Sequence, residues 1–558
     1  MLQQTAWIVM GLIAIAGCAS TPLPPDPQMQ CAELALPIAP AAIGLPHGGV
    51  TVDSATLVAA SALSVTERAP TPLASISPAL PQHCRVLGRI APVDPKAPAI
   101  HFQVNLPFEW NGRSVQFGGG GFNGVLITGL GLPPAARFDQ PGPLARGYVT
   151  YGTDSGHQNA PGVPVQAFAA NDEALVNFAH ASYKKVRDVA VELMKRRYGR
   201  APEKLYFVGS SEGGREGLTM AQRYPFDFDG IFSRVPVINW VGLQHAYLPP
   251  GLAMLGGEGW LSPAHVKLLG EAVLQQCDAD DGLADGIVSN LAACRARFNV
   301  NDLRCGVGQS GANCLNHAQV RAAQAHHADY LFDFSLANGV RSYPGRGLGG
   351  EATPGSGPVG GWVSWLTGQE APAWPAAPRN SIGWVYGSGT IAHFIARDPN
   401  IDIRQYEPGR YQQRVREISA LMDSTNPDLS AFNARGGKLI VLEHMADYAQ
   451  SPYAGIEYYK SVTSLLGQAK VDGFMRLYTA PGVDHVGTGA PANVDMLAVV
   501  ADWVERSQAP GTLEVVTQPN AAPFAVSNAR PLCRWPAWPR YRGSGAANAA
   551  ASFECVAN

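Results

Sequence analysis

The sequence predicts an α/β fold in which strands and helices alternate around a parallel sheet that one large insertion interrupts. Apolar, β-prone runs alternate with helical patterns from residue 147 to residue 236, and the alternation resumes after residue 437. Between residues 239 and 428 it stops, and Gly, Pro and Trp become frequent. The 558 residues are enough for one large core with an inserted second unit.

The beginning of the chain predicts export. Residues 7–17 form an apolar run too short to span a bilayer, and Ile15-Ala16-Gly17-Cys18 reads as a lipoprotein-type cleavage site. Residues 1–18 are therefore predicted as a signal peptide whose cleavage leaves a lipidated Cys18. We expect a periplasmic or cell-surface protein anchored to the outer membrane. Residues 1–6 carry no Lys or Arg, so a plainly cleaved signal and a secreted protein stay as the alternative.

The remaining organisation follows from composition. Residues 19–30 are rich in Pro, Ser and Thr and are predicted as a linker. Residues 31–238 and 429–558 are predicted as the two parts of the main domain, with residues 239–428 as a lid between them. Charged residues make up 15% of the chain and the net charge is -3, which favours neither nucleic acid nor an anionic membrane as a partner. We expect a small, largely uncharged or aromatic substrate.

Eight of the nine cysteines remain after Cys18, and an even number suits disulfides in an exported protein. The sequence alone does not fix their connectivity. Pairing of neighbours would give Cys31–Cys84, Cys277–Cys294, Cys305–Cys314 and Cys533–Cys555.

Residues 85–90, 99–106 and 114–117 are predicted strands, and the last of them runs into the four glycines of residues 118–121. A glycine-rich turn after a strand lets a backbone N–H approach a reacting atom, as an oxyanion hole requires. This loop is therefore a candidate to supply an oxyanion donor, with a merely flexible loop as the alternative.

The next elements lead to the predicted nucleophile. After a strand at residues 147–153, Asp154 and His157 are expected to stabilise their loop rather than to act in catalysis. Residues 171–198 are predicted as an amphipathic helix with Asn171 as its cap.

A nucleophile elbow follows. A strand over residues 204–209 ends in Gly209-x-Ser211-x-Gly213, and a helical pattern continues to residue 224. In so sharp a turn, side chains at the two glycine positions would collide with the neighbouring strand and helix. We expect Ser211 to point outward as the nucleophile and the backbone N–H of Glu212 to face the same spot.

The predicted lid offers an aromatic pocket. Trp362, Trp365, Trp384 and Tyr386 are candidates to line it, and packing between lid and core is the alternative for each.

The lid also contains an acidic loop. Asp278, Asp281 and Asp285, with glycines between them, suit a hard cation such as Ca²⁺. The loop lacks the spacing and the closing Glu of an EF-hand, and a solvated acidic turn is the alternative.

The last part of the chain supplies an acid and a base. A strand at residues 437–442 leads to Asp447, and a strand at residues 474–480 leads to His485. The order Ser, Asp, His belongs to α/β-hydrolases, so we expect an α/β-hydrolase fold with a large inserted lid domain. His444 is the competing base and Glu443 the competing acid.

From about Cys31 to the C-terminus, the chain resembles the tannase and feruloyl esterase family of α/β-hydrolases. The matching stretches are Glu109-Trp110-Asn111-Gly112-Arg113, residues 118–124, Gly213-Gly214-Arg215-Glu216-Gly217, residues 277–287, Asp447, His485 and Arg530-Pro531-Leu532-Cys533.

The resemblance implies roles for individual residues. It implies Ser211 as the nucleophile, His485 as the base and Asp447 as the acid that orients it, with the amides of Gly121 and Glu212 as oxyanion donors. It also implies a structural Ca²⁺ in the lid. The ligands would be the carboxylates of Asp278, Asp281 and Asp285 with the carbonyls of Leu283 and Ile287.

Two positions depart from the family pattern. The family usually joins the residue before the nucleophile to the residue after the histidine by a disulfide, but Ser210 and Val486 stand there, so we expect a less rigid site. Members that hydrolyse mono(2-hydroxyethyl) terephthalate hold its carboxylate with a lid arginine, and Ile382 takes that place here. Arg379 and Arg397 are possible substitutes.

The sequence thus predicts an exported serine esterase for small aromatic or phenolic esters. The alternatives are a hydrolase of the terephthalate monoester and a non-catalytic, lipid-anchored binding protein on a hydrolase fold. The oligomeric state is not predicted.

Overall fold

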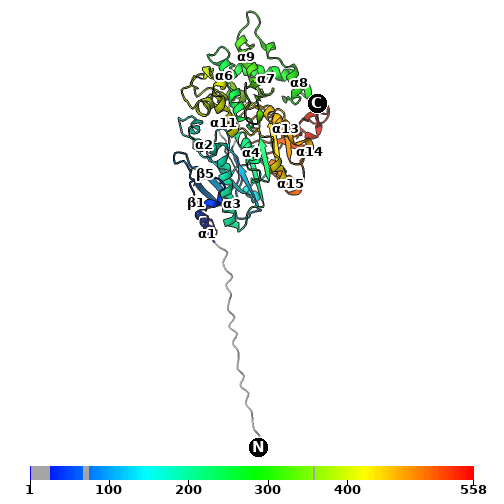
Figure 1. Cartoon of the computed structure of the whole chain (residues 1–558). Coiled ribbons are helices and arrows are strands. Elements are labelled where there is room, and N and C mark those ends of the chain that lie inside the picture. Colours follow the sequence, from blue (N-terminus) through cyan, green and yellow to red (C-terminus); the bar gives the residue numbers. More distant parts are fainter. Residues whose placement is uncertain (2–25, 67–74, 356–358, 558) are drawn as a thin grey trace.

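The computed structural model describes residues 1, 26–66, 75–355 and 359–557 (Figure 1). The predicted signal peptide with Cys18, apart from residue 1, and most of the predicted linker lie outside the described residues. In the described part of the chain, no helix combines the length and the apolar character that crossing a bilayer would need.

The centre of the molecule is a nine-stranded mixed sheet. Its strands from β7 to β13 run parallel, whereas β1, β4, β5 and β7 pair antiparallel. The parallel sheet expected from the alternation is therefore correct for one half only. In spatial order the strands are β1 (Val50–Val58), β4 (His83–Ile90), β5 (Ile100–Pro107), β7 (Val149–Thr153), β6 (Arg113–Phe117), β8 (Lys204–Ser210), β9 (Gly230–Arg234), β12 (Lys438–His444) and β13 (Met475–Ala480).

Both faces of the parallel half are buried, as β12 illustrates. Leu439 and Val441 pack in the core that contains residues of α4 (Glu212–Arg223) and α13 (Tyr453–Leu466). Ile440 and Leu442, which point the other way, pack with α15 (Met496–Arg506). The sheet is thus a layer between helices, and its strand ends are the exposed edges that can carry a site.

The helix expected over residues 171–198 forms α2 (Asp172–Val176), a π-helical turn (Asn177–Ala181) and α3 (Ser182–Tyr198). Asn171 caps α2, because its side chain accepts a hydrogen bond from Ala174 N. Short elements complete this part of the chain: α1 (Pro27–Ala32), β2 (Ser64–Thr66) and β3 (Ser75–Ser77).

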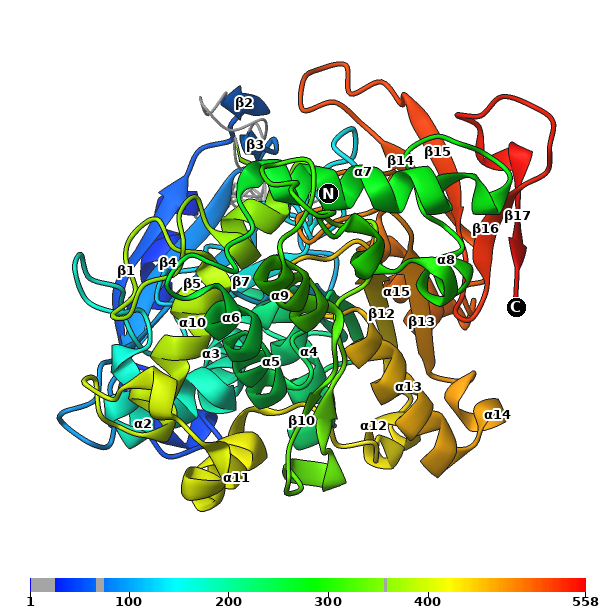
Figure 2. The same ribbon diagram turned by 90° about the horizontal axis from the view of Figure 1, so that it is seen from above.

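A mostly helical insertion separates β9 from β12 and lies over the sheet in Figure 2, and the predicted lid at residues 239–428 falls within it. Its core is apolar and includes Trp240, Trp362, Trp384 and Phe394. The elements are α5 (Trp240–Ala246), α6 (Leu248–Met254), α7 (Pro263–Cys277), α8 (Leu291–Arg297), α9 (His317–His327), β10 (Tyr330–Leu331), β11 (Ser342–Tyr343), α10 (Ile382–Thr390), α11 (Gln412–Met422) and α12 (Ser430–Ala434).

The C-terminal region forms two hairpins that the sequence did not predict. They pair β14 (Leu513–Thr517) with β15 (Asn528–Leu532) and β16 (Trp538–Tyr541) with β17 (Phe553–Val556). In Figure 2 they stand beside the insertion, at the same end of the molecule as α8. A one-turn helix, α14 (Gln468–Val471), follows α13.

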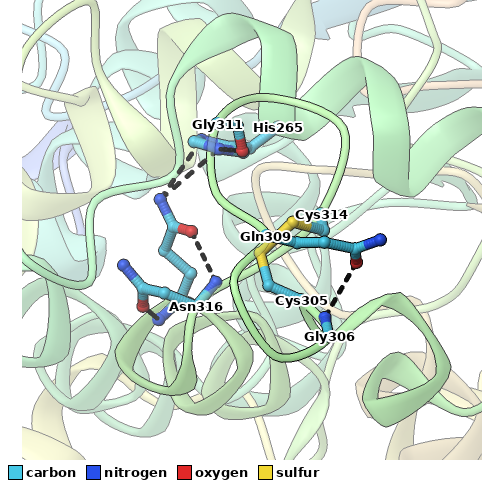
Figure 3. Close-up of a disulfide and its surroundings, with 8 residues drawn as sticks. His265, Cys305, Gly306, Gln309, Gly311, Cys314 and Asn316 are labelled. Atoms are coloured by element: carbon cyan, nitrogen blue, oxygen red, sulfur yellow. Dashed lines mark hydrogen bonds between the residues drawn. A yellow bond between two sulfur atoms is a disulfide. The ribbon is translucent and has the colours of Figure 1, made fainter.

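The structure pairs the eight described cysteines neighbour with neighbour, as expected. Figure 3 shows the Cys305–Cys314 bridge, which closes an exposed loop of the insertion. Within that loop Gln309 accepts a hydrogen bond from Gly306 N, and His265 of α7 lies 3.4 Å from the carbonyl oxygen of Gly311. Four bridges are typical of a protein that folds outside the cytosol.

Candidate active site

Ser211 stands on a strained turn between β8 and α4. Its backbone has φ 61° and ψ −121°, a conformation that L-residues rarely adopt. A Cβ on Gly209 would lie 2.0 Å from the carbonyl oxygen of Gly213, and a Cβ on Gly213 would lie 2.6 Å from that of Gly119. Only glycine fits at both positions, which is the geometry of a nucleophile elbow.

The predicted acid and base form a pair at the end of the neighbouring strands. Asp447 follows β12 and His485 follows β13, and His485 Nδ1 donates to Asp447 Oδ2 over 2.7 Å. The other oxygen, Oδ1, accepts from the amides of Ala449 at 2.7 Å and Gln450 at 3.0 Å. The carboxylate is therefore fixed in orientation and leaves His485 Nε2 as the nitrogen that can act as a base.

The two competing candidates occupy other environments. His444 is fully buried and its Nδ1 lies 2.6 Å from the carbonyl oxygen of Asp484. Burial holds the pKa of His444 well below its usual range. Glu443 lies in β12 and is buried, and within the described residues its carboxyl oxygens have no hydrogen-bond partner. Burial raises the pKa of Glu443 well above its usual range, so this side chain is a neutral acid.

The glycine-rich loop after β6 packs against the first turn of α4. Gly121 has φ 59°, and a Cβ there would lie 2.7 Å from the hydroxyl of Tyr386. Glu216 of α4 accepts hydrogen bonds from Gly119 N, Asn123 Nδ2 and Tyr183 Oη at 2.7–3.0 Å. This carboxyl therefore anchors the loop beside Ser211.

His157, which was expected to stabilise its own loop, supports the glycine-rich loop instead. Its Nε2–H donates to the carbonyl oxygen of Phe122 over 2.8 Å, one residue after Gly121. Burial lowers the pKa of His157 to about 4, so the ring is neutral. Asp154 accepts from the amides of His101 and Gly156. Both side chains act on loop structure at this edge of the sheet.

Glu212, the residue after the nucleophile, is buried together with Arg215. Arg215 Nε donates to Glu212 Oε1 over 2.7 Å. The guanidinium also donates to the carbonyl oxygens of Phe178, Ala179 and Met422. Burial raises the pKa of the Glu212 carboxyl to about 7, and the adjacent guanidinium opposes that shift. The pair fixes the start of α4 and thereby the backbone N–H of Glu212.

Another carboxylate, which the sequence analysis did not single out, organises the histidine loop. Asp484 Oδ1 accepts from the amides of Val486, Gly487 and Thr488 at 2.8–3.2 Å. Its Oδ2 accepts from Thr488 Oγ1 at 2.6 Å and from Gly355 N of the insertion at 3.0 Å. Asp484 therefore holds the loop that carries His485 and joins it to the lid.

The position that the family fills with a disulfide has a different contact. Arg234, the last residue of β9, donates Nε–H to Ser210 Oγ over 2.9 Å. The carbonyl oxygen of Arg234 accepts from Ser211 N over 3.0 Å. The elbow is thus tied to β9 at Ser210 and at the amide of Ser211.

A small pocket opens at Ser211, with a volume of about 20 Å³. It is lined by Gly121, Phe122, Ser211, Glu212, Val237, Trp240, Leu243, Gln244, Tyr247, Trp365, Tyr386, Ala449 and Gln450. Within the described residues none of the lining side chains is a lysine or an arginine. The Trp365 ring lies 5.6 Å from the imidazole of His485, which brings an aromatic side chain of the insertion to the base.

The other aromatic candidates lie elsewhere. Trp362 is 1% exposed and packs against His326 and His327 in the core of the insertion. Trp384 is buried as well and donates Nε1–H to the carbonyl oxygen of Ala373. Ile382 is the first residue of α10 and does not line the pocket. Of the four aromatic side chains predicted to line the pocket, the structure places two there, Trp365 and Tyr386.

The acidic loop lies between α7 and α8. Asp278 and Asp281 accept backbone amides of the loop, and Asp285 forms an ion pair with Arg530. Their oxygen chemistry suits Ca²⁺, but the Arg530 guanidinium already neutralises Asp285. Across the described residues, no three His, Cys, Asp or Glu side chains are grouped to hold a metal ion.

Ile287, at the end of this loop, packs next to the histidine loop. A Cβ on Gly482 would lie 2.8 Å from Ile287 Cγ2. The acidic loop therefore supports the site from outside the pocket.

The fold, the elbow and the acid–base pair define a hydrolase of the α/β type, and comparison with known proteins agrees. The family model described as tannase and feruloyl esterase matches residues 84–556. An uncharacterized esterase of Agrobacterium fabrum is 36% identical over 550 residues, which cover 94% of this chain and 93% of the relative.

Two further similarities agree. Mono(2-hydroxyethyl) terephthalate hydrolase of Piscinibacter sakaiensis is 32% identical over 532 residues, or 87% of each chain. Among solved structures, feruloyl esterase B from Aspergillus oryzae has a TM-score of 0.73 at 23% identity, covering 95% of this chain and 100% of that one, which supports the fold. The chain belongs to the tannase and feruloyl esterase family and is a carboxylic ester hydrolase.

Proposed function

We propose that the protein is an exported serine esterase that hydrolyses small aromatic esters through an acyl-enzyme. One observation carries the proposal: Asp447 holds the imidazole of His485 at 2.7 Å, and Ser211 stands on an elbow with φ 61° in a pocket whose Trp365 ring lies 5.6 Å from that imidazole. This arrangement activates a hydroxyl and has no evident use in a purely structural protein.

In the proposed mechanism, His485 Nε2 takes the proton of Ser211 Oγ as that oxygen attacks the ester carbonyl carbon. The amides of Gly121 and Glu212 donate to the oxyanion, and His485 returns the proton to the leaving alcohol. Water then attacks the acyl-enzyme with His485 as base and releases the carboxylic acid. Asp447 keeps the imidazole in the required tautomer and stabilises its protonated form.

The walls of the pocket support an uncharged aromatic substrate. Trp240, Tyr247, Trp365 and Tyr386 contribute rings to it. A volume of about 20 Å³ has room for about one water molecule, so an aryl ester requires side chains of the insertion to shift. No lysine or arginine is among the described residues that line the pocket, so a substrate carboxylate would be buried without a charge partner.

The test is hydrolysis by the mature protein of methyl ferulate, methyl gallate, a short-chain p-nitrophenyl ester and mono(2-hydroxyethyl) terephthalate. Ser211→Ala serves as the control. We expect turnover of the neutral esters and a loss of several powers of ten in kcat for Ser211→Ala. Covalent labelling of Ser211 by a fluorophosphonate adds a direct readout. A protein that is neither labelled nor active would belong to the alternative, a binding protein on a hydrolase fold.

A second candidate substrate, mono(2-hydroxyethyl) terephthalate, has the support of the relative at 32% identity that is named for it. The two arginines considered as its partners are engaged elsewhere. Arg379 lies 3.8 Å from Glu370, and Arg397 forms an ion pair with Asp172. Preferred turnover of the monoester over methyl ferulate would reverse this ranking.

We further propose that the acidic loop binds a structural Ca²⁺ through Asp278, Asp281 and Asp285 with the carbonyls of Leu283 and Ile287. To bind the ion, the Asp285 carboxylate would have to break its ion pair with Arg530. The measurement is the melting temperature with added Ca²⁺ and with a chelator. We expect Ca²⁺ to raise it in the parent but not in Asp281→Asn.

The matched control is Asp280→Asn, a neighbouring carboxylate that pairs with Arg297 outside the proposed set. It should respond to Ca²⁺ as the parent does. Equal melting temperatures of the parent in Ca²⁺ and in chelator would refute the site.

Export and anchoring are part of the same proposal. Four disulfides support an oxidising compartment, and Cys18 is the residue proposed to carry the lipid. Mass spectrometry of the mature N-terminus tests it: an acylated Cys18 supports an anchor, and an unmodified N-terminus supports plain secretion.

A further inference from the structure

A second pocket borders the histidine loop and does not include Trp365 among its lining residues. Its volume is about 490 Å³. Its walls come from the loop after β6, the histidine loop and the first C-terminal hairpin: Leu132, Pro133, Ala135, Ala136, Phe138, Arg234, Val486, Gly487, Thr488, Gly489, Ala490, Ala492, Asn493, Thr517, Gln518, Asn520, Ser527 and Asn528. Arg234 is the one charged side chain among these lining residues.

Arg234 is poorly satisfied by the protein. Its Nε–H donates to Ser210 Oγ, and within the described residues no other hydrogen bond and no ion pair of this guanidinium occurs. Its Nη1 lies 3.4 Å from the place where a Cβ of Gly487 would stand. The Nη groups thus meet a glycine, whose missing side chain leaves them open to the pocket.

The nearby acids favour the charged form of this arginine but form no ion pair with it within the described residues. Asp447 and Asp484 are the carboxylates that act on it, and both are committed to other bonds. Asp447 holds His485, and Asp484 holds the amides of its own loop. Burial lowers the pKa of Arg234 to about 10, because its effect on the charged guanidinium is larger than the opposing effect of the two carboxylates. A guanidinium is still charged at neutral pH, so an anion is the partner that would stabilise it most.

Three neutral polar side chains of the pocket are already paired. Gln518 accepts from Phe138 N and donates to the carbonyl oxygen of Phe524. Asn493 donates to the carbonyl oxygen of Ala136. Thr488 donates to Asp484. They define the shape of the pocket, whereas the Nη groups of Arg234 supply charged donors without a partner among the described residues.

The apolar part of the wall decides which anion fits. Leu132, Pro133 and Phe138 face the same space as Arg234. One positive group beside an apolar surface suits a carboxylate with an apolar or aromatic body better than a small inorganic anion. An ester hydrolase releases one carboxylic acid per turnover, so the reaction itself supplies such a molecule.

We propose that this pocket binds an organic monocarboxylate, paired with Arg234, at a site separate from the catalytic pocket. The carboxylate oxygens accept from the Nη groups, and the body of the acid lies against Phe138 and its apolar neighbours. The inference rests on the hydrolase only for the source of the ligand; the pocket binds added benzoate whether or not the enzyme turns over an ester.

The experiment measures benzoate binding by titration calorimetry to full-length mature protein carrying Ser211→Ala. Benzamide, a neutral analogue of the same shape, and inorganic phosphate are the comparison ligands. We expect saturable binding of benzoate, at least tenfold weaker binding of benzamide, and weaker binding of phosphate. Equal affinities for benzoate and benzamide would overturn the proposal, and tighter binding of phosphate would overturn the assignment to an organic acid.

Three variants locate the site. Arg234→Gln should weaken benzoate binding at least tenfold, while Arg223→Gln, which removes a charge outside the pocket, should leave it unchanged. Ser527→Trp obstructs an exposed wall and keeps the Arg234–Ser210 bond, so it decides the question if Arg234→Gln fails to fold. Trp365→Ala perturbs the catalytic pocket and should leave benzoate binding in place. Benzoate binding that survives Ser527→Trp and disappears in Trp365→Ala belongs to the catalytic pocket and refutes the second site.

Discussion

Asp447→Asn tests the acid–base pair most sharply, because the structure dictates how the new amide must lie. Oδ1 of Asp447 accepts from the amides of Ala449 and Gln450, at 2.7 and 3.0 Å. An asparagine keeps both bonds only if its carbonyl oxygen takes that position. Its NH₂ group then faces His485 Nδ1, which must become an acceptor, so the proton moves to Nε2 and the base is lost.

The magnitude follows from that wrong tautomer. We expect kcat to fall about 10³–10⁴-fold with little change in KM, equivalent to about 4–5.5 kcal/mol of transition-state stabilisation. The assay is steady-state hydrolysis of a p-nitrophenyl ester, with the melting temperature as a check of folding. A fall in kcat with an unchanged melting temperature matches the tautomer mechanism.

Glu443→Gln is the matched control, the same carboxyl-to-amide change on the same strand end. Glu443 has no hydrogen-bond partner among the described residues and is a neutral acid, so its amide should retain kcat within about threefold. The assignment of Asp447 is refuted if Asp447→Asn hydrolyses at the parent's rate while Glu443→Gln is inactive.

Two further changes probe the oxyanion loop and the buried acids. Gly121→Ala forces a side chain onto a φ of 59° and against the Tyr386 hydroxyl, and should lower kcat about 10²–10³-fold. In the control Gly120→Ala the new Cβ meets nothing within 4 Å, so its kcat should stay near that of the parent. Equal rates of the two variants would exclude the Gly121 amide as a donor. Burial raises the pKa of Glu351 to about 7 from the ordinary 4.5, so the unfolded chain loses this proton first and the free energy of unfolding falls by up to about 3 kcal/mol as pH rises from 4.5 through 7. Glu351→Gln should flatten that part of the stability curve in denaturant melts at several pH values, and the exposed control Glu258→Gln should not; an unchanged slope in Glu351→Gln would refute the buried-acid explanation.

The sequence was most informative where geometry is local. The elbow glycines, the strands that lead to Asp447 and His485 and the cap at Asn171 each follow from a short pattern that only one backbone arrangement satisfies. The turns that carry Ser211, Asp447 and His485 therefore follow the strands that the pattern predicted.

The sequence patterns did not predict contacts between distant segments. The order of β6 and β7 in the sheet, and the antiparallel pairing of β1, β4 and β5, depend on which strands meet, and alternation does not encode that. Trp362 and Trp365 are three residues apart, yet one fills the core of the insertion and the other reaches His485. In the sequence Asp484 looks like any other acidic loop residue, because its role depends on the backbone amides that it contacts only in the folded structure.

The hydrogen bond from Gly355 N to Asp484 Oδ2 makes the structure of the histidine loop depend on a backbone donor of the insertion. An exchange of lid segments between related esterases is an attractive way to alter substrate preference, because Trp365 and Tyr386 travel with the segment. Any grafted lid must also present a backbone donor to Asp484 Oδ2, since that carboxylate shapes the turn on which His485 depends. A chimera without that donor would lose rate on every ester alike, so a uniform loss across substrates would point to this joint rather than to the pocket.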